Sequence, residues 1–540
     1  MKNTDIFRAF DMVVSLTEQD INRQLLGLRE LHVIRPQLII VQTIGTNPDT
    51  GALEYVYDVP DDASDIPADA AYLNAQLIPQ VSVSETGPNI TFVLQMPGGD
   101  ARLWSGHGRL ARLVDHTIDN WAYGVVIGMD LYKLSKDELA DDSGKRKVKM
   151  PDHVREQLQG FQERDFNIRS LFMDFESADL VRFDPATTSV GDAGDPVRDQ
   201  LIEFMQNYLD WLICKEGNPY VLGYAIDQAD QDPCYYPDIP ATLRPVGTTY
   251  TMYNDPGNDS TLSNLSFALV TAGGFGKVTS SAGNLDTSWF SAKEGLDGKM
   301  IISSADFIEA QILRPLYENL KSKTWEQLDD ADLDVTQGND YTTGRALTGS
   351  GFEFTISNDD DGDDHYVNTF TADFNNHETS VDIQIKGHIH AYKHVTGGGP
   401  GCNASASARS SVKWSTTITI SVSKDAAGRP ALEVSPPAAQ IDDHSSHTHK
   451  NDCAKAVEWI DKILGNLLDA FTLFQRDFFR DLLDVSFTQT PVDLSVAVEN
   501  LSSVVQTTLL LPGGDSFYIK SPAVDPEGHL TLALTSKSEH

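Results

Sequence analysis

Residues 10–25 read FDMVVSLTEQDINRQL, and this stretch predicts a short buried strand that runs directly into an amphipathic helix. Residues 10–16 are mostly apolar, as expected for a strand buried on both faces. Thr17 is a suitable N-cap, because its hydroxyl can accept a hydrogen bond from the first turn, where acidic side chains also favour the helix dipole. Apolar residues then recur at spacings of four and three, on one helix face. That stripe consists of Ile21, Leu25 and Leu28.

Long strands with one apolar face recur throughout the chain. The longest is 121–131, WAYGVVIGMDL, in which large apolar side chains alternate with small or polar ones. A period of two predicts a strand with one buried face. That face consists of Trp121, Tyr123, Val125, Ile127, Met129 and Leu131. The segments 35–44 and 52–58 flank an Asn-Pro-Asp-Thr-Gly turn and predict a hairpin. Further strands are expected at 379–393, 410–423 and 431–435.

Three further amphipathic helices are expected, at 197–213, 304–321 and 453–484. Asp195 and Pro196 are expected to begin the helix at 197–213, as its cap and its first helical residue. The stretch 435–452 is rich in Ser, His and Asp and predicts a loop. Two copies of Pro-Gly-Gly-Asp, at 97–100 and 512–515, are each expected to end an apolar strand in a turn.

These patterns predict an α+β protein that is rich in antiparallel strands and has few strong helices. With 540 residues the chain is too long for one compact core, so several modules are expected. We place an N-terminal module at 1–215, a strand-rich middle block at 216–330 and a C-terminal module at 331–540. The last two can also form one module, and the terminal strands can pair with the N-terminal module.

The composition is strongly acidic, with 79 Asp and Glu against 41 Lys and Arg and a net charge of −38. Such a surface repels nucleic acid and anionic membranes at long range and suits basic partners or cations, and a solvated acidic surface without a specific partner is the favoured interpretation. No apolar run approaches the roughly 20 residues of a bilayer span, and residues 1–16 lack the core of a secretory signal. We therefore expect cytoplasmic synthesis, with any release by a non-classical route. Four cysteines are too few for a disulfide framework, although Cys402 and Cys453 flank one segment and could pair under oxidising conditions.

The acidic stretch 358–364 is the best cation candidate, because packed carboxylates suit calcium. Its candidate ligands are Asp359, Asp361 and Asp363. An EF-hand is excluded, since Ser357 and Asn368 would occupy the first and last ligand positions. A polar hairpin tip is the favoured interpretation.

Histidines form two further candidate metal sites. His388 and His390 lie two apart on a predicted strand, hence on the same face, but zinc needs at least one more ligand. The loop residues His444, His447 and His449 have a metal-like composition. A solvent-facing polar row is the favoured interpretation of His388 and His390, and a flexible loop rich in His is weak evidence for a metal site at His444, His447 and His449. No P-loop, zinc-protease or nucleophile-elbow motif is present, so we expect no catalytic residue and no cofactor.

Six stretches, spread over nearly the whole chain, share a pattern of apolar spacing with a known family. They are FDMVVSLTEQDINRQL at 10–25, WAYGVVIGMDL at 121–131, DFNIRSLFMDFESADL at 165–180, PYVLGYAI at 219–226, LSNLSFALVT at 262–271 and LLLPGGDSFYIKSPAVDPEGHLTLAL at 509–534. In these stretches the chain resembles the clostridial toxin-cluster proteins of the OrfX group and its 47-kDa companion protein. Those proteins share the fold of the tubular lipid-binding (TULIP) superfamily.

The resemblance implies an elongated protein of two or more modules, in which long curved antiparallel sheets wrap around long amphipathic helices. It implies a non-enzymatic protein that binds lipid, another apolar ligand or a protein partner, as an accessory component of a toxin-associated gene cluster. The residues expected to line an apolar groove are Ile21, Leu25, Leu28, Trp121, Tyr123, Val125 and Ile127. One alternative is a structural scaffold with a filled core and no ligand. A less favoured one is a metal-dependent hydrolase that uses the His and Asp clusters.

Overall fold

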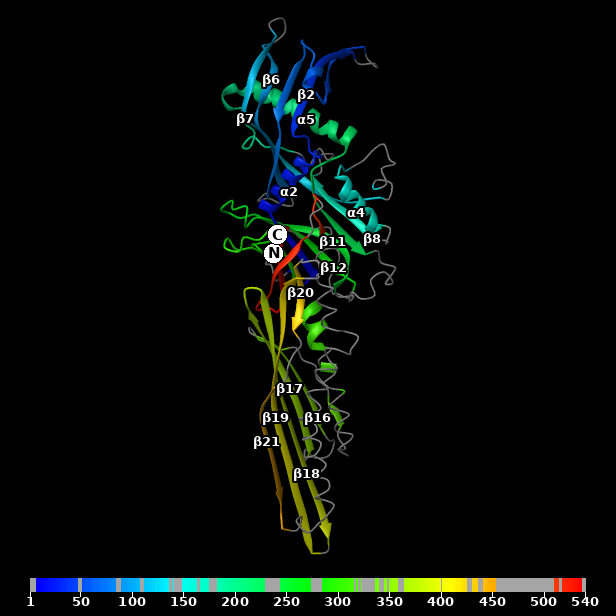
Figure 1. Cartoon of the computed structure of the whole chain (residues 1–540), viewed down its shortest axis with the longest axis vertical. Coiled ribbons are helices and arrows are strands. Elements are labelled where there is room, and N and C mark those ends of the chain that lie inside the picture. Colours follow the sequence, from blue (N-terminus) through cyan, green and yellow to red (C-terminus); the bar gives the residue numbers. More distant parts are fainter. Residues whose placement is uncertain are drawn as a thin grey trace.

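The computed structural model describes residues 6–46, 51–83, 89–106, 111–135, 139, 148–162, 166–173, 182–228, 243–272, 284–314, 317–318, 322, 336–338, 344–346, 349–357, 364–399, 401–424, 430–435, 440–452, 509–513 and 517–536. The protein is elongated, and three sheets follow one another along its long axis (Figure 1). Their strands pair antiparallel, and one sheet curls into a half-barrel. A strand-rich α+β fold of this kind agrees with the predicted class.

The opening strand lies at the centre of the six-stranded sheet. β1 (Met12–Thr17) pairs with β12 on one side and β13 on the other, and all of its residues are buried. In sheet order the strands are β11 (Pro245–Tyr253), β12 (Asn264–Thr271), β1, β13 (Gly298–Ile302), β24 (Leu530–Thr535) and β23 (Tyr518–Val524). Ser15 Oγ donates to Asn264 Oδ1 at 3.1 Å inside this sheet. Segments from both ends of the chain therefore share one sheet.

The ten-stranded sheet holds the hairpin and the long alternating strand. In order its strands are β22 (Leu509–Leu510), β10 (Val221–Gln228), β8 (Phe166–Met173), β7 (Arg112–Lys133), β6 (Asn89–Ser105), β4 (Ala71–Gln76), β2 (Gln37–Thr46) and β3 (Leu53–Asp58), with β5 (Ile78–Val83) beside β6 and β9 (Arg182–Phe183) beside β7. β2 and β3 pair as the predicted hairpin. The alternation on β7 is also confirmed, because Trp121 and every second residue as far as Met129 are buried.

The helices are short relative to the strands. They are α2 (Glu18–Glu30), α4 (Asp152–Gln162), α5 (Asp195–Trp211), which continues into η4 (Leu212–Glu216), the π-type helix η6 (Ala305–Leu313), and the single turns η1 (Ala63–Asp65) and η3 (Gly191–Ala193). Thr17 caps α2 as predicted, since its Oγ1 accepts from the Asp20 N–H at 3.1 Å. The cap of α5 is Gly194, one residue before the predicted Asp195, and its φ of 84° suits glycine.

The eight-stranded sheet contains β19, the longest strand in the described part of the chain. In order they are β14 (Thr336–Gly338), β16 (Gly349–Ser357), β17 (Asp364–Asn376), β18 (Ser380–Gly399), β19 (Cys402–Lys424) and β20 (Pro430–Ser435), with β15 (Gly344–Ala346) beside β16 and β21 (Gln440–Lys450) beside β19. Trp414 is buried and lies opposite Gly387. A Cβ atom at Gly387 would lie 2.0 Å from Trp414 Cε2, so only glycine leaves room for the indole.

Two predicted loops are strands in the structure. The stretch 435–452 contains β21, which pairs with β19 along its length. The first Pro-Gly-Gly-Asp does not end a strand, because β6 runs through 97–100. Gly99 has a φ of 148° there, and a Cβ atom on it would lie 2.2 Å from the Asn74 carbonyl oxygen. The second copy begins in a turn after β22, as predicted.

Several predictions concern residues outside the described part. These are the helix at 453–484, Cys453, and the carboxylates of Asp359, Asp361 and Asp363, so the pairing of Cys453 with Cys402 stays a prediction. The helix expected at 304–321 is described mainly as η6, in which Ile308 is buried. The boundaries at 215/216 and 330/331 stay predictions. Among the described residues, no helix is both long enough and apolar enough to span a bilayer.

Candidate apolar binding site

The seven predicted groove residues belong to one contiguous cluster of buried apolar side chains. The stripe on α2 and the inner face of β7 contribute to it, and each of these side chains is at most 3% exposed. The same cluster includes side chains from all three sheets, among them Leu94, Leu265 and Trp414. The structure therefore brings the predicted residues into one apolar interior. A ligand-binding role for them stays a prediction.

Polar side chains hold α2 along the outer edge of β5, and sequence reasoning missed them. The Asn22 carboxamide makes two hydrogen bonds with Val81, accepting from its N–H at 2.7 Å and donating to its carbonyl oxygen at 2.9 Å. Glu18 Oε2 accepts from the Val83 N–H at 2.9 Å, and Arg29 Nε donates to the Leu77 carbonyl oxygen at 2.7 Å. These side chains satisfy backbone groups on the side of β5 where the described part of the chain has no neighbouring strand. Their i, i+4 and i+11 spacing on one helix face was the available signal.

The Glu18 side chain is buried in this arrangement, and burial changes the pKa of its carboxyl group. Desolvation raises the pKa of Glu18, and the hydrogen bonds from Val83 N–H and the Ser82 hydroxyl oppose that effect only in part. The charged form is disfavoured because the carboxyl group has left water. Helix α2 thus turns its apolar stripe into the core, while its polar face replaces a strand beside β5.

Aromatic side chains surround the buried face of α5, which packs against β2, β6 and β7 (Figure 1). Phe92 and Tyr220 have ring centroids 4.8 Å apart, and the hydroxyl oxygens of Tyr208 and Tyr220 are 3.4 Å apart. Both tyrosines are fully buried. Burial raises the pKa of Tyr208 to about 12, and it raises the pKa of Tyr220 well above its ordinary value. These hydroxyls are therefore neutral hydrogen-bond donors at physiological pH.

An ionic cluster lies at the end of α5 where the chain leaves this interior. Arg35 pairs with Glu216, and Lys149 Nζ lies 3.0 Å from Glu216 Oε2. The Arg35 guanidinium also lies over the Trp211 ring, 4.9 Å from its centroid. Burial opposes the charge of Glu216, but the hydrogen bonds from Arg35 and Lys149 outweigh it and lower the pKa of Glu216.

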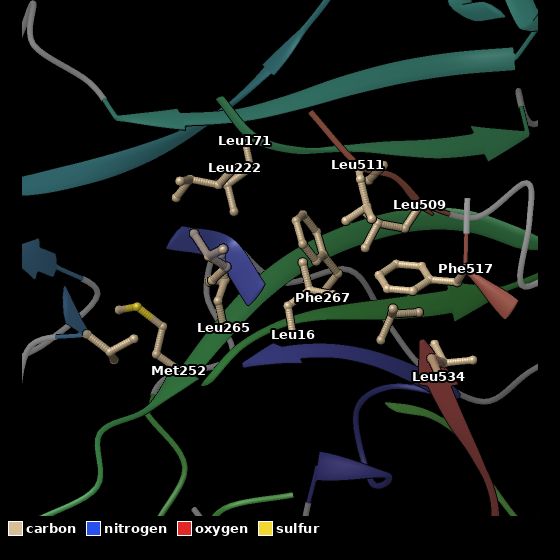
Figure 2. Close-up of a cluster of buried hydrophobic side chains, with 14 of the residues drawn as sticks. Leu16, Leu171, Leu222, Met252, Leu265, Phe267, Leu509, Leu511, Phe517 and Leu534 are labelled. Atoms are coloured by element: carbon tan, nitrogen blue, oxygen red, sulfur yellow. The ribbon is translucent and has the colours of Figure 1, made fainter. Parts of the chain in front are cut away.

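Another part of the same apolar cluster joins the ten-stranded sheet to the six-stranded sheet. Its labelled members in Figure 2 are Leu16, Leu171, Leu222, Met252, Leu265, Phe267, Leu509, Leu511, Phe517 and Leu534. They come from both sheets and point toward one another between the strands. A Cβ atom at Gly223 would lie 3.0 Å from Phe267 Cζ, so the sheets approach closely here. This contact between the two sheets extends the apolar interior from one sheet to the next.

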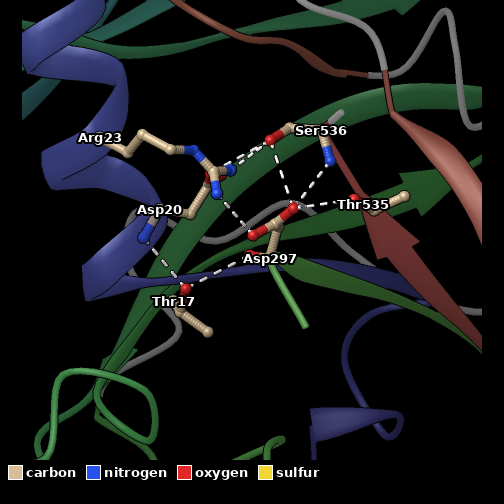
Figure 3. Close-up of polar contacts among 6 residues, drawn as sticks. All are labelled: Thr17, Asp20, Arg23, Asp297, Thr535 and Ser536. Carbon is tan, nitrogen blue, oxygen red and sulfur yellow. Dashed lines mark hydrogen bonds and ion pairs between the residues drawn. The ribbon is translucent and has the colours of Figure 1, made fainter. Parts of the chain in front are cut away.

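A polar network ties the start of α2 to the end of β24 (Figure 3). Arg23 pairs with Asp20 and, through Nη1, with Asp297 Oδ1 at 2.9 Å. Asp297 Oδ2 also accepts from Thr535 Oγ1 and from the Ser536 N–H, each at 3.0 Å. Residues far apart in the sequence thus meet at one point.

The two carboxyl groups that share Arg23 shift in opposite directions. Burial raises the pKa of Asp20 to about 7, against the attraction of Arg23. Burial also acts on Asp297, but hydrogen bonds from Arg23 and Ser536 outweigh it and lower the pKa of Asp297. One guanidinium cannot neutralise two carboxylates, so the more buried one takes up a proton first. That one is Asp20, because its side chain is fully buried.

The predicted histidine sites are dispersed. His388 and His390 share a face of β18, with ring centroids 6.4 Å apart, and His388 Nε2 bonds Ser411 Oγ at 2.8 Å. His447 and His449 lie on one face of β21, and the exposed His444 lies three residues earlier, on the other face. Among the described residues, no group of three or more His, Cys, Asp or Glu side chains is arranged to hold a metal ion.

Comparisons with known proteins give distant likenesses. No protein-family model matches the chain, and no curated protein matches it. A crystal structure of P47 of Clostridium botulinum E1 is similar over 98% of this chain and 99% of its own, with 10% sequence identity and a TM-score of 0.47. A crystal structure of lipopolysaccharide binding protein is similar over 98% of each chain, with 9% identity and a TM-score of 0.27. Both TM-scores lie below 0.5, so neither likeness carries an argument about what this chain binds.

Proposed function

We propose that this protein is a non-enzymatic binding protein that holds a lipid or another apolar ligand in its interior. In this proposal its modules are TULIP-like, with curved sheets wrapped around amphipathic helices. The observation that supports it most is the continuity of the buried apolar cluster, to which α2, α5 and all three sheets contribute. An extended hydrocarbon chain suits such an interior, because each methylene group removed from water contributes about 0.8 kcal/mol.

The buried tyrosine pair would orient such a ligand. A carboxyl or ester group that enters an apolar interior needs a hydrogen-bond donor, because an unsatisfied polar group there costs roughly 1–3 kcal/mol. The Tyr208 hydroxyl stays protonated at neutral pH, and its contact with Tyr220 is long at 3.4 Å. Tyr208 is therefore our candidate for the residue that binds the polar end.

The setting of this activity rests on the sequence resemblance alone. It favours an accessory role in a toxin-associated assembly, in which the protein would bring its ligand to a protein partner or bind that partner directly. No catalytic step is part of the proposal.

A scaffold with a filled core is the second candidate, and the close packing of the two sheets favours it. A Cβ atom at Gly223 would lie 3.0 Å from Phe267, and one at Gly298 would lie 3.3 Å from Phe517. Side chains that meet this closely leave little room between them. In this alternative the apolar interior only stabilises an elongated shape.

Extraction of the purified protein separates the two candidates. We expect native mass spectrometry to show an added mass of lipid size, and organic extraction with lipid mass spectrometry to recover the same molecule. Stripped protein should then take up a fluorescent fatty acid. If the mass equals that of the polypeptide and no fatty acid is taken up, the ligand proposal is wrong and the filled scaffold is favoured.

A pair of conservative variants tests the role of Tyr208. Tyr208→Phe removes one hydroxyl and leaves the ring, so we expect fatty-acid affinity to fall about fivefold, which corresponds to a hydrogen bond of roughly 1 kcal/mol. Tyr55→Phe is the matched control, because Tyr55 is exposed on β3. Equal affinities for both variants would show that Tyr208 does not bind the polar end.

A further inference from the structure

The hairpin of β2 and β3 concentrates exposed apolar side chains. Four of the six large apolar side chains that are exposed in the described part of the chain lie on it. Their exposed fractions are 61% for Ile44, 76% for Leu53, 54% for Tyr55 and 43% for Val56. Ile44 and Tyr55 lie opposite each other in the pairing, and Leu53 shares their face of the ribbon, whereas Val56 is on the other face. Both faces of β3 therefore present apolar groups to solvent.

This strand is well formed despite its exposure. It pairs with β2 along its whole length, and Val56 covers Gly45 so closely that a Cβ atom there would lie 2.5 Å from Val56 Cγ2. At its far end the Tyr57 hydroxyl donates to Glu203 Oε1 of α5 at 2.6 Å. The hairpin is thus fixed to the body of the protein while Leu53 and Tyr55 project from it.

β3 ends the strand order of the ten-stranded sheet in the described part of the chain. The outer side of β5 in the same sheet is covered by α2, with Asn22 and Glu18 bonded to its backbone. Natural sheets protect their edges by such covers, by charges or by proline, because an open edge is a template for another strand. In the described part of the chain no strand pairs with the outer side of β3, and an apolar edge strand of this kind is suited to strand addition.

The charge around the outer edge of β3 indicates which kind of partner strand binds there best. Glu54 and Asp58 belong to β3 itself, and further carboxylates follow at Asp61, Asp62 and Asp65. A second copy of this chain would bring the same acidic hairpin and a further net charge of −38 against it. A partner strand with basic side chains between its apolar ones would gain cross-strand attraction instead.

We propose that β3 is a docking edge, to which a basic partner protein adds an extended segment of alternating apolar and Lys or Arg residues. The segment continues the ten-stranded sheet through backbone hydrogen bonds, and its apolar side chains cover Leu53 and Tyr55. This inference does not depend on an interior ligand, since lipid uptake is measured in a separate assay.

The test uses the full chain and three labelled hexapeptides. The probe peptide alternates Val and Lys, the second alternates Val and Glu, and the third has the probe's composition in two blocks, Lys-Lys-Lys-Val-Val-Val. Fluorescence anisotropy should show binding of the alternating Val-Lys peptide alone. Hydrogen exchange measured by mass spectrometry should show that this peptide protects the amides of 53–58. Leu53→Ser with Tyr55→Ser should weaken binding about tenfold, as expected for the loss of two cross-strand pairs.

Leu31→Ser is the matched control, because Leu31 is also exposed but lies at the end of α2. It should leave binding unchanged. Equal binding of the block peptide would show attraction by charge alone and would overturn the proposal, as would protection of amides outside β3. Sedimentation that shows a dimer of this chain, lost in the Leu53 and Tyr55 variant, would assign the edge to a second copy and also overturn it.

Discussion

Asp20→Asn should stabilise the protein at pH 8, and its effect on stability should be smaller at pH 5. Asp20 lies at the start of α2, where it shares Arg23 with Asp297 and receives a hydrogen bond from the Ser536 hydroxyl at 3.3 Å. Its Oδ2 is buried without a hydrogen-bond partner in the described part of the structure. Burial is the main reason that the pKa of Asp20 is raised to about 7.

The sign follows from the two pKa values. The pKa of Asp20 is about 7 in the folded protein, against 3.8 for an aspartate in water. Between these values the folded protein holds a proton that the unfolded chain has lost, so the free energy of unfolding increases as the pH falls from 7 toward 4. A shift of roughly three pKa units corresponds to about 4 kcal/mol. This destabilisation of the folded protein is absent below about pH 4 and complete above about pH 7. After allowance for the lost pair with half-exposed Arg23, Asp20→Asn should gain about 1–3 kcal/mol at pH 8.

Urea denaturation followed by circular dichroism, at pH values from 5 to 8, measures this effect. The matched control is Asp199→Asn, which removes one charge from an exposed position on α5 and thus corrects for the high net charge. The carboxyl groups of Asp306 and Asp525 also have raised pKa values, and both variants retain them. If Asp20→Asn changes stability equally at every pH, or destabilises the protein at pH 8, then Asp20 is ionised in the folded state and the reasoning is wrong.

Three further substitutions test contacts that position the sheets. Gly387→Ala should lower the free energy of unfolding by about 1–3 kcal/mol, because its Cβ atom would lie 2.0 Å from Trp414 Cε2; urea unfolding with tryptophan fluorescence measures the loss. Gly27→Ala, in α2 with no atom within 4 Å of the new Cβ, should instead raise that free energy by about 0.5–1 kcal/mol in the same assay. Asn22→Ala should cost about 2–3 kcal/mol, because two backbone groups of Val81 lose their partner, and hydrogen exchange should accelerate at the Val81 amide.

Local features of this fold could be predicted from the sequence because their causes are local. The cap at Thr17 needs only a hydroxyl before an amphipathic run, and the alternation from Trp121 to Met129 needs only one buried face. The hairpin of β2 and β3 follows from a turn between two strand-like segments. Each of these depends on residues within one or two turns of chain.

Strand partners could not be predicted in the same way. β1 pairs with β12 and β13, which lie more than 200 residues later in the chain, and nothing within residues 10–25 specifies them. The network of Asp20, Arg23 and Asp297 depends on that pairing, so it could not be predicted from the sequence either. Its residues appear in the sequence only as ordinary charged positions of a helix and a loop.

β21 was mistaken for a loop for a different physical reason. Strand signals in a sequence come from burial, because a buried face produces the apolar alternation. Residues 442–449 are all exposed, although β21 pairs with β19 from Ala406 to Ser415. Its strand conformation is held by backbone hydrogen bonds, which leave no pattern in side-chain polarity.

Sequence patterns are limited in a related way in what they indicate about the candidate site. A periodic apolar face indicates which side chains leave water, since the driving force scales with the apolar area removed from solvent. That area is the same whether protein side chains or an acyl chain cover it, so the pattern of Ile21, Leu25 and Trp121 identifies an interior without identifying its occupant. Polar groups differ in this respect, because a buried hydroxyl requires a partner. The Tyr208 hydroxyl is therefore the more informative position for distinguishing a ligand from a filled core.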